Sequence, residues 1–382
     1  MLGLVIVVAM QASSCPCVET PARLNHASLR TRAVAEPVLQ DTGSTSEDSL
    51  QVAWSGFVDA YYAWDSGHPS AFDRPYTTQA ARSNEFNINL AHVGVSLVSP
   101  RVRGRVALQA GTSVQANYAG EPTTGSLSGP SLSRHIQEAT AGARLADGLW
   151  LDGGIYFSYI GLEGWISRDN PTYTRSLVAE FSPYYLSGAR LTWQPAHRPF
   201  TMQLHVMNGW QNIAENNGSK SVGLRVDWQA STALTVTYAN FIGNEQPDTA
   251  TRQTRVFNQV MARLASANGA LVQGQVDVGH QASKDWYGFT MVGRLPVSSS
   301  AALVARIERY SDPDQVIVAT GTPNGFSANG ASIGCDIKYA GGLVWRTELR
   351  GLRTSAPLFP QGSAPNASRT NLLVVSSLAL TL

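Results

Sequence analysis

The sequence predicts an all-β protein, a transmembrane antiparallel β-barrel whose roughly sixteen strands run up and down through a membrane. Apolar and polar residues alternate along about sixteen segments, which puts successive side chains on opposite faces of a strand. Charged residues make up only 14% of the 382 residues, whereas soluble domains carry roughly 25%. Long polar loops and short turns alternate between the segments, as in outer-membrane barrels.

The segment Leu149–Ile160 shows the alternation most clearly. One row of side chains is apolar and ends in aromatic residues, and the other carries Asp152, Tyr156 and Ser158. A large soluble β-sandwich or solenoid is the alternative, because its strands alternate too. The predicted strands are, however, mostly about 10 to 14 residues long, against the usual 5 to 6, and the chain has no repeat of fixed period.

The chain divides into three predicted regions. Residues 1–17 form an apolar leader followed by small residues, which indicates a secretory signal peptide, and Cys15 leaves a lipoprotein-type cleavage site open. Residues 18–50 are polar and are expected to form a flexible periplasmic segment. Residues 51–382 are expected to form the barrel in the outer membrane, the cellular location that the whole pattern indicates.

The expected strands follow one another along the barrel region. In order they are Val52–Trp64, Asn84–Val98, Val102–Tyr118, Ser133–Ala146, Leu149–Ile160, Ser182–Gln194, Phe200–Trp210, Lys220–Gln229, Ala233–Asn244, Thr254–Ala265, Ala270–Gln281, Asp285–Pro296, Ala302–Ser311, Ala328–Tyr339, Leu343–Arg353 and Thr370–Leu382. An even number of strands puts both termini on one side, expected to be the periplasm. A barrel of this width encloses a water-filled channel.

Aromatic residues near the strand ends are expected to form girdles at the two membrane interfaces. They are Trp54, Trp64, Tyr159, Tyr184, Trp193, Trp210, Trp228, Trp286 and Trp345.

Several stretches resemble a known family. They include Arg82–Leu90, Gln115–Pro122, Asn208–Gln211, Phe241–Glu245 and Val318–Phe326. The resemblance is to the OmpL-like family of β-barrel porins and spans about residues 55–382. It implies a location in the outer membrane of a Gram-negative bacterium. It does not indicate a transported compound, because that family is defined by its architecture.

Charged side chains on the polar rows are expected to face the lumen, because a charge facing lipid at the midplane costs about 2–4 kcal/mol. The predicted pore-lining residues are Asp59, Arg103, Arg105, Asp152, Arg190, Arg225, Asp227, Arg263, Asp277, Arg306, Glu308, Arg346, Glu348 and Arg350. They either create a transverse field that filters solutes or pair with cross-strand neighbours. The near balance of charge predicts weak ion selectivity with a slight preference for anions.

The long loop 161–181 carries the segment Asp169–Arg175. This segment either folds into the lumen as a constriction or stays outside as a surface loop. The sequence leaves both alternatives open.

No catalytic, metal-binding or phosphate-binding motif is present, and His205 is interpreted as an ordinary polar wall residue. The formal net charge of +1 argues against a nucleic-acid partner. The expected function is passive diffusion of small hydrophilic solutes through a barrel in the lipid bilayer, without an enzyme activity or cofactor. Association into a homo-oligomer is compatible with this reading. A non-conducting barrel that acts as a surface adhesin or scaffold is the alternative.

Overall fold

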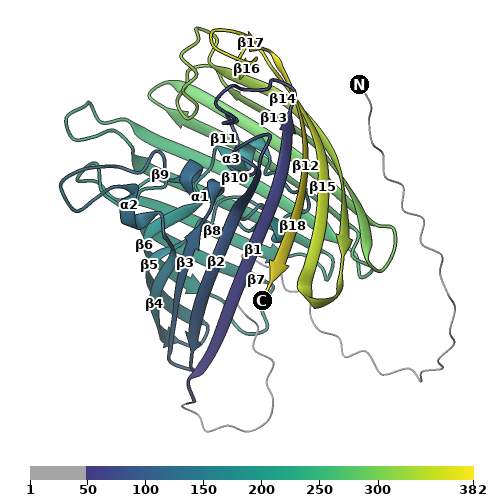
Figure 1. Cartoon of the computed structure of the whole chain (residues 1–382). Coiled ribbons are helices and arrows are strands. Elements are labelled where there is room, and N and C mark those ends of the chain that lie inside the picture. Colours follow the sequence, from purple (N-terminus) through teal and green to yellow (C-terminus); the bar gives the residue numbers. More distant parts are fainter. Residues whose placement is uncertain (1–48) are drawn as a thin grey trace, which may run out of the picture. The chain divides into compact units, whose positions relative to one another are not determined.

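The computed structural model of the chain describes residues 49–382 (Figure 1). The predicted leader 1–17 and residues 18–48 of the predicted periplasmic segment lie outside the described residues, so these two assignments stay predictions.

Within the described residues, sixteen antiparallel strands form one closed sheet, which confirms the predicted fold class and the position of every predicted strand. The strands are β1 (Gln51–Asp65), β2 (Phe86–Val98), β3 (Val102–Ala110), β4 (Ile136–Ala146), β5 (Leu149–Phe157), β6 (Tyr185–Trp193), β7 (Phe200–Met207), β8 (Ser221–Gln229), β9 (Leu234–Asn244), β10 (Thr254–Ala265), β11 (Leu271–Gln281), β12 (Lys284–Pro296), β13 (Ala301–Asp312), β14 (Phe326–Lys338), β15 (Leu343–Thr354) and β18 (Thr370–Thr381).

Short elements occupy the connections. They are α1 (Thr112–Asn117), α2 (Pro130–Ser133), α3 (Leu177–Glu180), the two 3-10 turns η1 (Ser167–Asp169) and η2 (Ala340–Gly342), and the small hairpin of β16 (Phe359–Pro360) with β17 (Ala367–Ser368). No helix among residues 49–382 is both long and apolar enough to cross a membrane.

The sheet closes where β1 pairs with β18, in a register that runs from Phe57 opposite Thr381 to Asp65 opposite Leu373. Closure gives the backbone groups of both edge strands a partner, which a sheet surrounded by hydrocarbon requires. A bulge between Asp59 and Ala60 shifts the register of β1 against β2. It leaves both Asp59 and Asn89 fully buried on the inner side.

The burial pattern is the reverse of that of a soluble protein. On β11, the outward residues Val272, Val276 and Val278 are 51%, 55% and 53% exposed, whereas Gln273 and Asp277 on the inner row are 4% and 2% exposed. Apolar side chains therefore cover the outside of the barrel and polar ones face inward, as lipid outside and polar material inside require.

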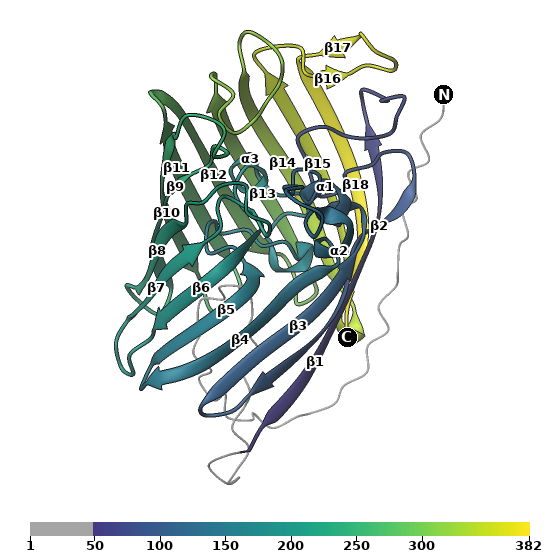
Figure 2. The ribbon, with the colours of Figure 1, turned by 90° about the vertical axis from the view of Figure 1, so that its left-hand side faces the viewer.

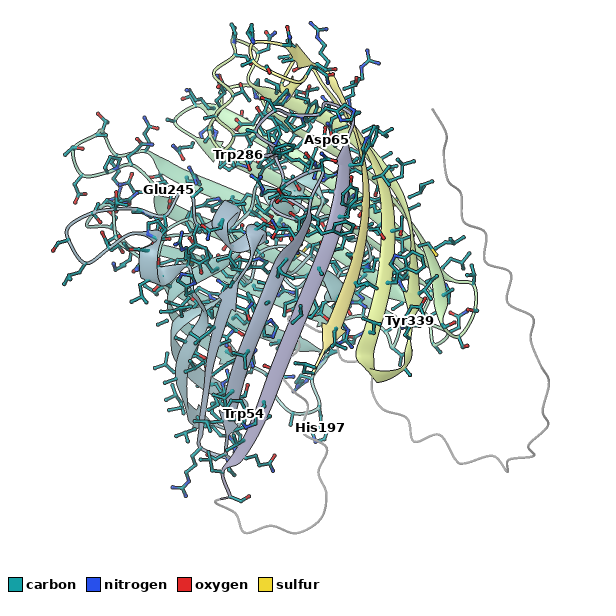
Figure 3. All side chains as sticks on the ribbon, in the orientation of Figure 1. Trp54, Asp65, His197, Glu245, Trp286 and Tyr339 are labelled. Atoms are coloured by element: carbon teal, nitrogen blue, oxygen red, sulfur yellow. The ribbon has the colours of Figure 1, made fainter. Side chains whose placement is uncertain are left out.

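The two ends of the barrel differ. Short turns such as Ser99–Arg101 and Asp147–Gly148 join the strands at one end, where β1 begins and β18 ends. In Figure 3, Trp54, His197 and Tyr339 lie toward this short-turn end. Most connections at the opposite, long-loop end are long. The exception is the connection between β11 and β12, which consists of Ala282 and Ser283 alone. Both of these residues have positive φ values, 50° and 64°, as a tight hairpin turn requires.

Two expectations were wrong in part. The predicted strand Val102–Tyr118 ends at Ala110, because Gly111 adopts a φ of 140° and the chain continues into α1. Among the expected girdle residues, Trp54, Trp64, Trp193, Trp228 and Trp345 are exposed on the outside. Tyr159, Tyr184 and Trp286 are instead 4%, 4% and 1% exposed, and Trp210 packs against the same buried cluster as Tyr159 and Trp286.

Candidate channel constriction

The connection between β5 and β6 (residues 158–184, hereafter the inner loop) enters the barrel, which resolves the two alternatives left open for this segment (Figure 2). Its first aromatic residue is held by the neighbouring wall. The ring of Tyr159 stacks on His205 at 4.0 Å between centroids, and its hydroxyl donates to the carbonyl of Asn240 at 2.6 Å. Arg225 donates to the carbonyl of Tyr159 at 2.5 Å. The loop therefore turns inward as soon as β5 ends.

The next residues of the inner loop bind β10 and β11 through two glutamines. Gly161 donates its backbone N–H to Gln259 at 2.7 Å, and the N–H of Leu162 donates to Gln275 at 3.0 Å. Both glutamines donate in turn to Asp277, at 2.7 Å and 3.1 Å. Asp277 thus orients the two amides whose oxygens hold the loop backbone.

The middle of the inner loop reaches the wall opposite its origin. In the order of the sixteen strands, β13 to β15 lie half-way around the barrel from β5 and β6. Arg346 on β15 donates to the carbonyls of Asn170 and Pro171 at 2.8 Å and 2.7 Å, and also to that of Ser167. Asp336 accepts from the same guanidinium at 2.9 Å. One arginine therefore caps three loop carbonyls that lack strand partners.

Beside Arg346, a group of buried charged side chains binds residues 172–177 of the inner loop. Arg306 on β13 donates to the hydroxyl of Thr172 at 2.8 Å and to the carbonyl of Thr174 at 2.5 Å. Glu348 accepts from the N–H and hydroxyl of Thr174 at 2.7 Å and 2.8 Å. Glu308 accepts from the N–H of Leu177 at 2.7 Å. We refer to Arg306, Glu308, Arg346 and Glu348 as the loop clamp.

The charges of the loop clamp balance within the wall. Arg306 lies 3.1 Å from Glu348 and 3.5 Å from Glu308, and Arg350 lies 2.8 Å from Glu308. All of these side chains are 2% exposed or less. A buried ion pair contributes little to stability by itself. Removing one partner is strongly destabilising, because the other charge is left buried and unpaired.

The inner loop is also held on the side of β1. Asp59 accepts from the hydroxyl of Ser167 at 2.7 Å and from Asn89 at 2.8 Å. Gln79, in the first long loop, donates to the carbonyl of Trp165 at 2.8 Å. Glu180 in α3 accepts from the N–H of Thr78 at 3.0 Å. Contacts with three separate parts of the wall fix the loop across the lumen.

Within the inner loop, Glu163 joins the first part of the loop to Ser176 near its end. It accepts from the N–H of Ser176 at 3.1 Å and also from the hydroxyl of Ser176. Its nearest strand cation is Arg306, at 3.8 Å. Burial raises the pKa of Glu163 above its usual value, and Arg306 and Ser176 offset this only in part.

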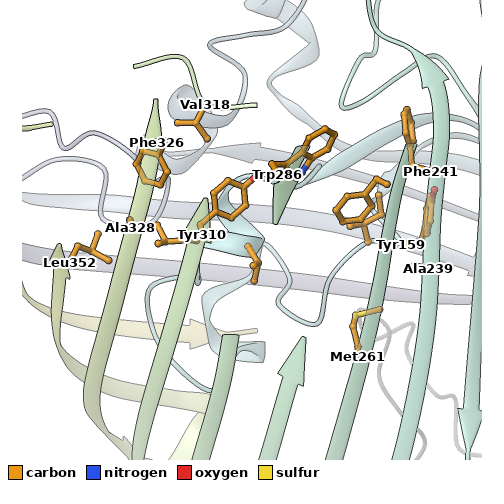
Figure 4. Packing of buried hydrophobic residues seen from close by; sticks show 14 of the residues in the cluster. Tyr159, Ala239, Phe241, Met261, Trp286, Tyr310, Val318, Phe326, Ala328 and Leu352 are labelled. Carbon is orange, nitrogen blue, oxygen red and sulfur yellow. The ribbon is translucent and has the colours of Figure 1, made fainter. Parts of the chain in front are cut away.

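Apolar and aromatic side chains pack between the inner loop and the wall (Figure 4). Leu177 and Val178 of the loop join Phe241, Trp286 and Tyr310 of the strands in one buried cluster. A second cluster places Trp165 of the loop against Tyr118 and Tyr185. The lumen is therefore narrowed at the level of the inner loop by packed side chains as well as by charges.

The wall between the inner loop and the short-turn end has a more open set of charges on β3 to β6. Arg103 forms a bidentate pair with Asp152 at 2.7 Å and 2.6 Å, and Arg190 lies 3.2 Å from the same carboxylate. Arg105 pairs with Glu138. The side chains of Arg103, Arg105 and Arg190 are 20%, 20% and 18% exposed. We refer to Arg103, Arg105, Arg190, Asp152 and Glu138 as the arginine wall.

All predicted pore-lining residues lie on inward rows, but they serve different contacts. Asp59, Arg225, Arg306, Glu308, Arg346 and Glu348 bind the inner loop directly, Asp277 acts through the two glutamines, and Arg350 acts through Glu308. Arg103, Arg105, Asp152 and Arg190 form the arginine wall, and Asp227 binds Arg225 at 2.8 Å. Arg263 has no polar partner among residues 49–382.

Sequence reasoning missed Gln259, Gln275 and Ser167, which connect the loop to the wall. It included Thr174 in the segment that folds inward but gave it no partner. The inward alternation of β10 and β11 identifies the two glutamines as lumen residues. No sequence signal pairs Thr174 with Glu348, which is distant in the chain. Within residues 49–382, no three His, Cys, Asp or Glu side chains are grouped so that they could hold a metal ion.

The comparisons with known proteins agree with this geometry. The family described as "Putative beta-barrel porin-2, OmpL-like" matches residues 51–382. The chain belongs to this porin family. Membership places it among outer-membrane porin-like barrels and points to a channel rather than an enzyme. A search of curated proteins gave no match.

Solved structures with a similar fold include an outer-membrane channel and an anion-selective porin. The outer-membrane channel DcaP of Acinetobacter baumannii superposes with a TM-score of 0.60 at 9% identity, covering 87% of this chain and 97% of that one. An anion-selective porin from Comamonas acidovorans superposes with a TM-score of 0.55 at 10% identity, covering 87% of this chain and 100% of that one. OmpF of Salmonella typhi superposes with a TM-score of 0.56 at 12% identity, covering 87% of this chain and 97% of that one. At these identities the likeness establishes the fold that this porin-family chain shares with them.

Proposed function

We propose that this porin-family barrel lets small hydrophilic solutes diffuse passively across the outer membrane, and that the inner loop sets the size limit. The observation that carries the proposal is the span of the loop, which is bound to β7–β11 near its origin and to β13 and β15 opposite. A loop held on facing walls leaves a restricted passage beside it, which excludes large solutes and admits small ones.

The charges support a weak preference for anions. The arginine wall has three arginines against two carboxylates, and Arg263 adds a cation that no described carboxylate neutralises. A partly exposed surplus of positive charge raises the local concentration of small anions. The anion-selective porin among the structural neighbours is consistent with this preference.

Liposome swelling tests solute passage. Purified protein is reconstituted, and swelling is followed in uncharged sugars of increasing size. We expect rapid entry of the smallest sugars and a sharp loss of entry as the size increases. Protein that migrates as a folded, heat-modifiable barrel yet admits no sugar would contradict the proposal and favour the surface adhesin or scaffold.

A further inference from the structure

The outer face of the barrel has a groove of about 490 Å³ near the long-loop end, where β14, β15 and β18 lie side by side. The groove exists because small residues meet on adjacent strands. Ala331 on β14 pairs with Gly351 on β15, and Gly351 pairs with Leu372 on β18. A Cβ atom added at Gly351 would meet its nearest neighbour only at 4.0 Å, so the space above it is open.

The floor of the groove continues as an apolar strip toward the short-turn end. The next outward row consists of Ile333, Leu349 and Val374, which are 62%, 38% and 39% exposed. A groove that is continuous with such a strip suits an extended hydrocarbon chain, because the chain can pack in van der Waals contact along it.

Toward the long-loop end, Asn329, Arg353 and Thr370 line the groove, and Arg309 lies beside Asn329 in the same row. The outward row there is Arg309, Asn329, Arg353 and Thr370, each paired with the next across adjacent strands. Arg309 donates to Asn329 at 2.8 Å. Neither Arg309 nor Arg353 has a carboxylate partner among residues 49–382. The inward arginines of the loop clamp, by contrast, are all paired.

The position of these arginines fits the level of lipid headgroups. Arg309 precedes the end of β13 at Asp312 by three residues, and Arg353 precedes the end of β15 at Thr354 by one. An arginine that faces lipid near a strand end is tolerated because its guanidinium reaches the interface. A planar guanidinium also matches the oxygens of a phosphate in a bidentate arrangement.

We propose that this groove binds a lipid whose headgroup carries phosphate groups without a cation of its own, taken from the leaflet on the long-loop side. The phosphate lies between Arg309 and Arg353, and an acyl chain runs along Ala331 and Gly351. The site is separate from the lumen, and the inference does not depend on solute passage.

Charge favours this lipid over a second copy of the barrel. The outward rows of the described strands carry one carboxylate, Asp285, and it is bound to His280 at 2.7 Å. Arg309 donates to the hydroxyl of Tyr287 at 3.3 Å and to Asn329, but these partners are neutral. Another copy of this wall therefore offers little to neutralise the two arginines, whereas an anionic phosphorylated headgroup neutralises both.

Native mass spectrometry of the full-length, detergent-purified protein tests the site. The probe is lipid A that carries two phosphates, with phosphatidylcholine as the comparison lipid. We expect the wild type to retain lipid A in preference to phosphatidylcholine. The double variant Arg309→Gln/Arg353→Gln should lose affinity for lipid A by about tenfold or more, because both phosphate contacts are removed. The matched control is Arg198→Gln, an exposed arginine in a turn at the opposite end, which should bind as the wild type does.

A second variant tests the contribution of the groove independently of the two arginines. Ala331→Phe keeps both arginines and fills the groove from the outside, so it cannot disturb packing inside the barrel. It should weaken lipid A binding while the barrel stays heat-modifiable. Equal binding by the double variant and the Arg198→Gln control would overturn the proposal. Self-association of the wild type that is abolished by Ala331→Phe would overturn it as well, because a second copy would then occupy the groove.

Discussion

At the scale of single residues, buried charge explains how the inner loop is held. Arg306 and Arg346 pair with strand carboxylates and also donate to loop carbonyls and hydroxyls. Glu308 and Glu348 accept loop N–H groups. Hydrogen bonds to charged groups contribute about 1.5–3 kcal/mol each. These bonds therefore offset part of the conformational entropy that the loop loses when it is ordered.

Substitution of Arg306 tests the loop clamp. Arg306→Gln leaves Glu348 without its strand cation and removes the bonds to Thr172 and Thr174. We expect a loss of about 3–5 kcal/mol in the free energy of unfolding, the range for breaking a buried pair. Urea-dependent unfolding in detergent measures it. The control is Arg294→Gln, whose guanidinium is partly exposed and 3.7 Å from Asp336, and which should change stability by about 1 kcal/mol or less. Equal losses in the two variants would count against the clamp.

Glu163 predicts a pH dependence. Its pKa is raised by burial above the usual value of 4.5, so the folded protein holds a proton that the unfolded chain releases more readily. The stabilisation is complete at low pH and is lost as the pH rises through the raised value. Glu163→Gln stays neutral throughout. The variant should therefore match the wild type near pH 4.5 and exceed it in melting temperature at higher pH. A difference that is constant with pH would show that Glu163 does not titrate in this way.

At the scale of elements, strand alternation decides which side of the wall meets lipid. On β10, Val260 is 54% exposed, whereas Gln259 and Met261 beside it are 1% exposed. The same alternation predicted every strand, since it follows from the local geometry of an extended chain. It failed at the end of β3 and for Tyr159 and Trp286. There, side chains bury against an element that is distant in sequence rather than at the membrane interface.

A charge placed on the outer row tests the assignment of the lipid-facing side. Val260→Arg puts a guanidinium on the middle of β10 and should destabilise the barrel by about 2–4 kcal/mol. Val297→Arg, at the turn after β12, lies near the interface and should cost about 0–1 kcal/mol. Folding into lipid vesicles at increasing urea measures both. Similar costs for the two variants would mean that depth in the membrane does not govern the effect.

The arginine wall predicts the sign of selectivity. Arg103→Gln/Arg190→Gln removes both cations beside Asp152 and leaves that carboxylate uncompensated. We expect the weak anion preference of the wild type to change to a preference for cations, seen as a reversal potential of opposite sign in a salt gradient. Arg144→Gln, whose partner Asp147 is fully exposed in the turn, is the control and should leave the potential unchanged. An unchanged potential in the double variant would show that other charges set selectivity.

At the scale of the whole molecule, the closed sheet and the inner loop depend on each other. The fold class, the strands and the inward position of the charged residues could all be predicted from the sequence, because each follows from local alternation. The pairing of Thr174 with Glu348 and of Gly161 with Gln259 could not, because it depends on how the closed barrel brings opposite walls within reach of one loop. The same charges that looked like a lumen lining serve largely to fix this loop.

Single-channel conductance of a loop-shortened barrel tests the central claim that the inner loop limits the pore. Residues 166–175, which bind the loop clamp, are replaced by Gly-Ser-Gly, and the variant is compared with the wild type in planar bilayers. Removal of residues 363–366 in the β16–β17 hairpin serves as the control. We expect a severalfold higher conductance and entry of larger sugars for the loop-shortened variant, with no change for the control. Conductance that stays at the wild-type value in a correctly folded loop-shortened barrel would show that the inner loop does not limit the pore.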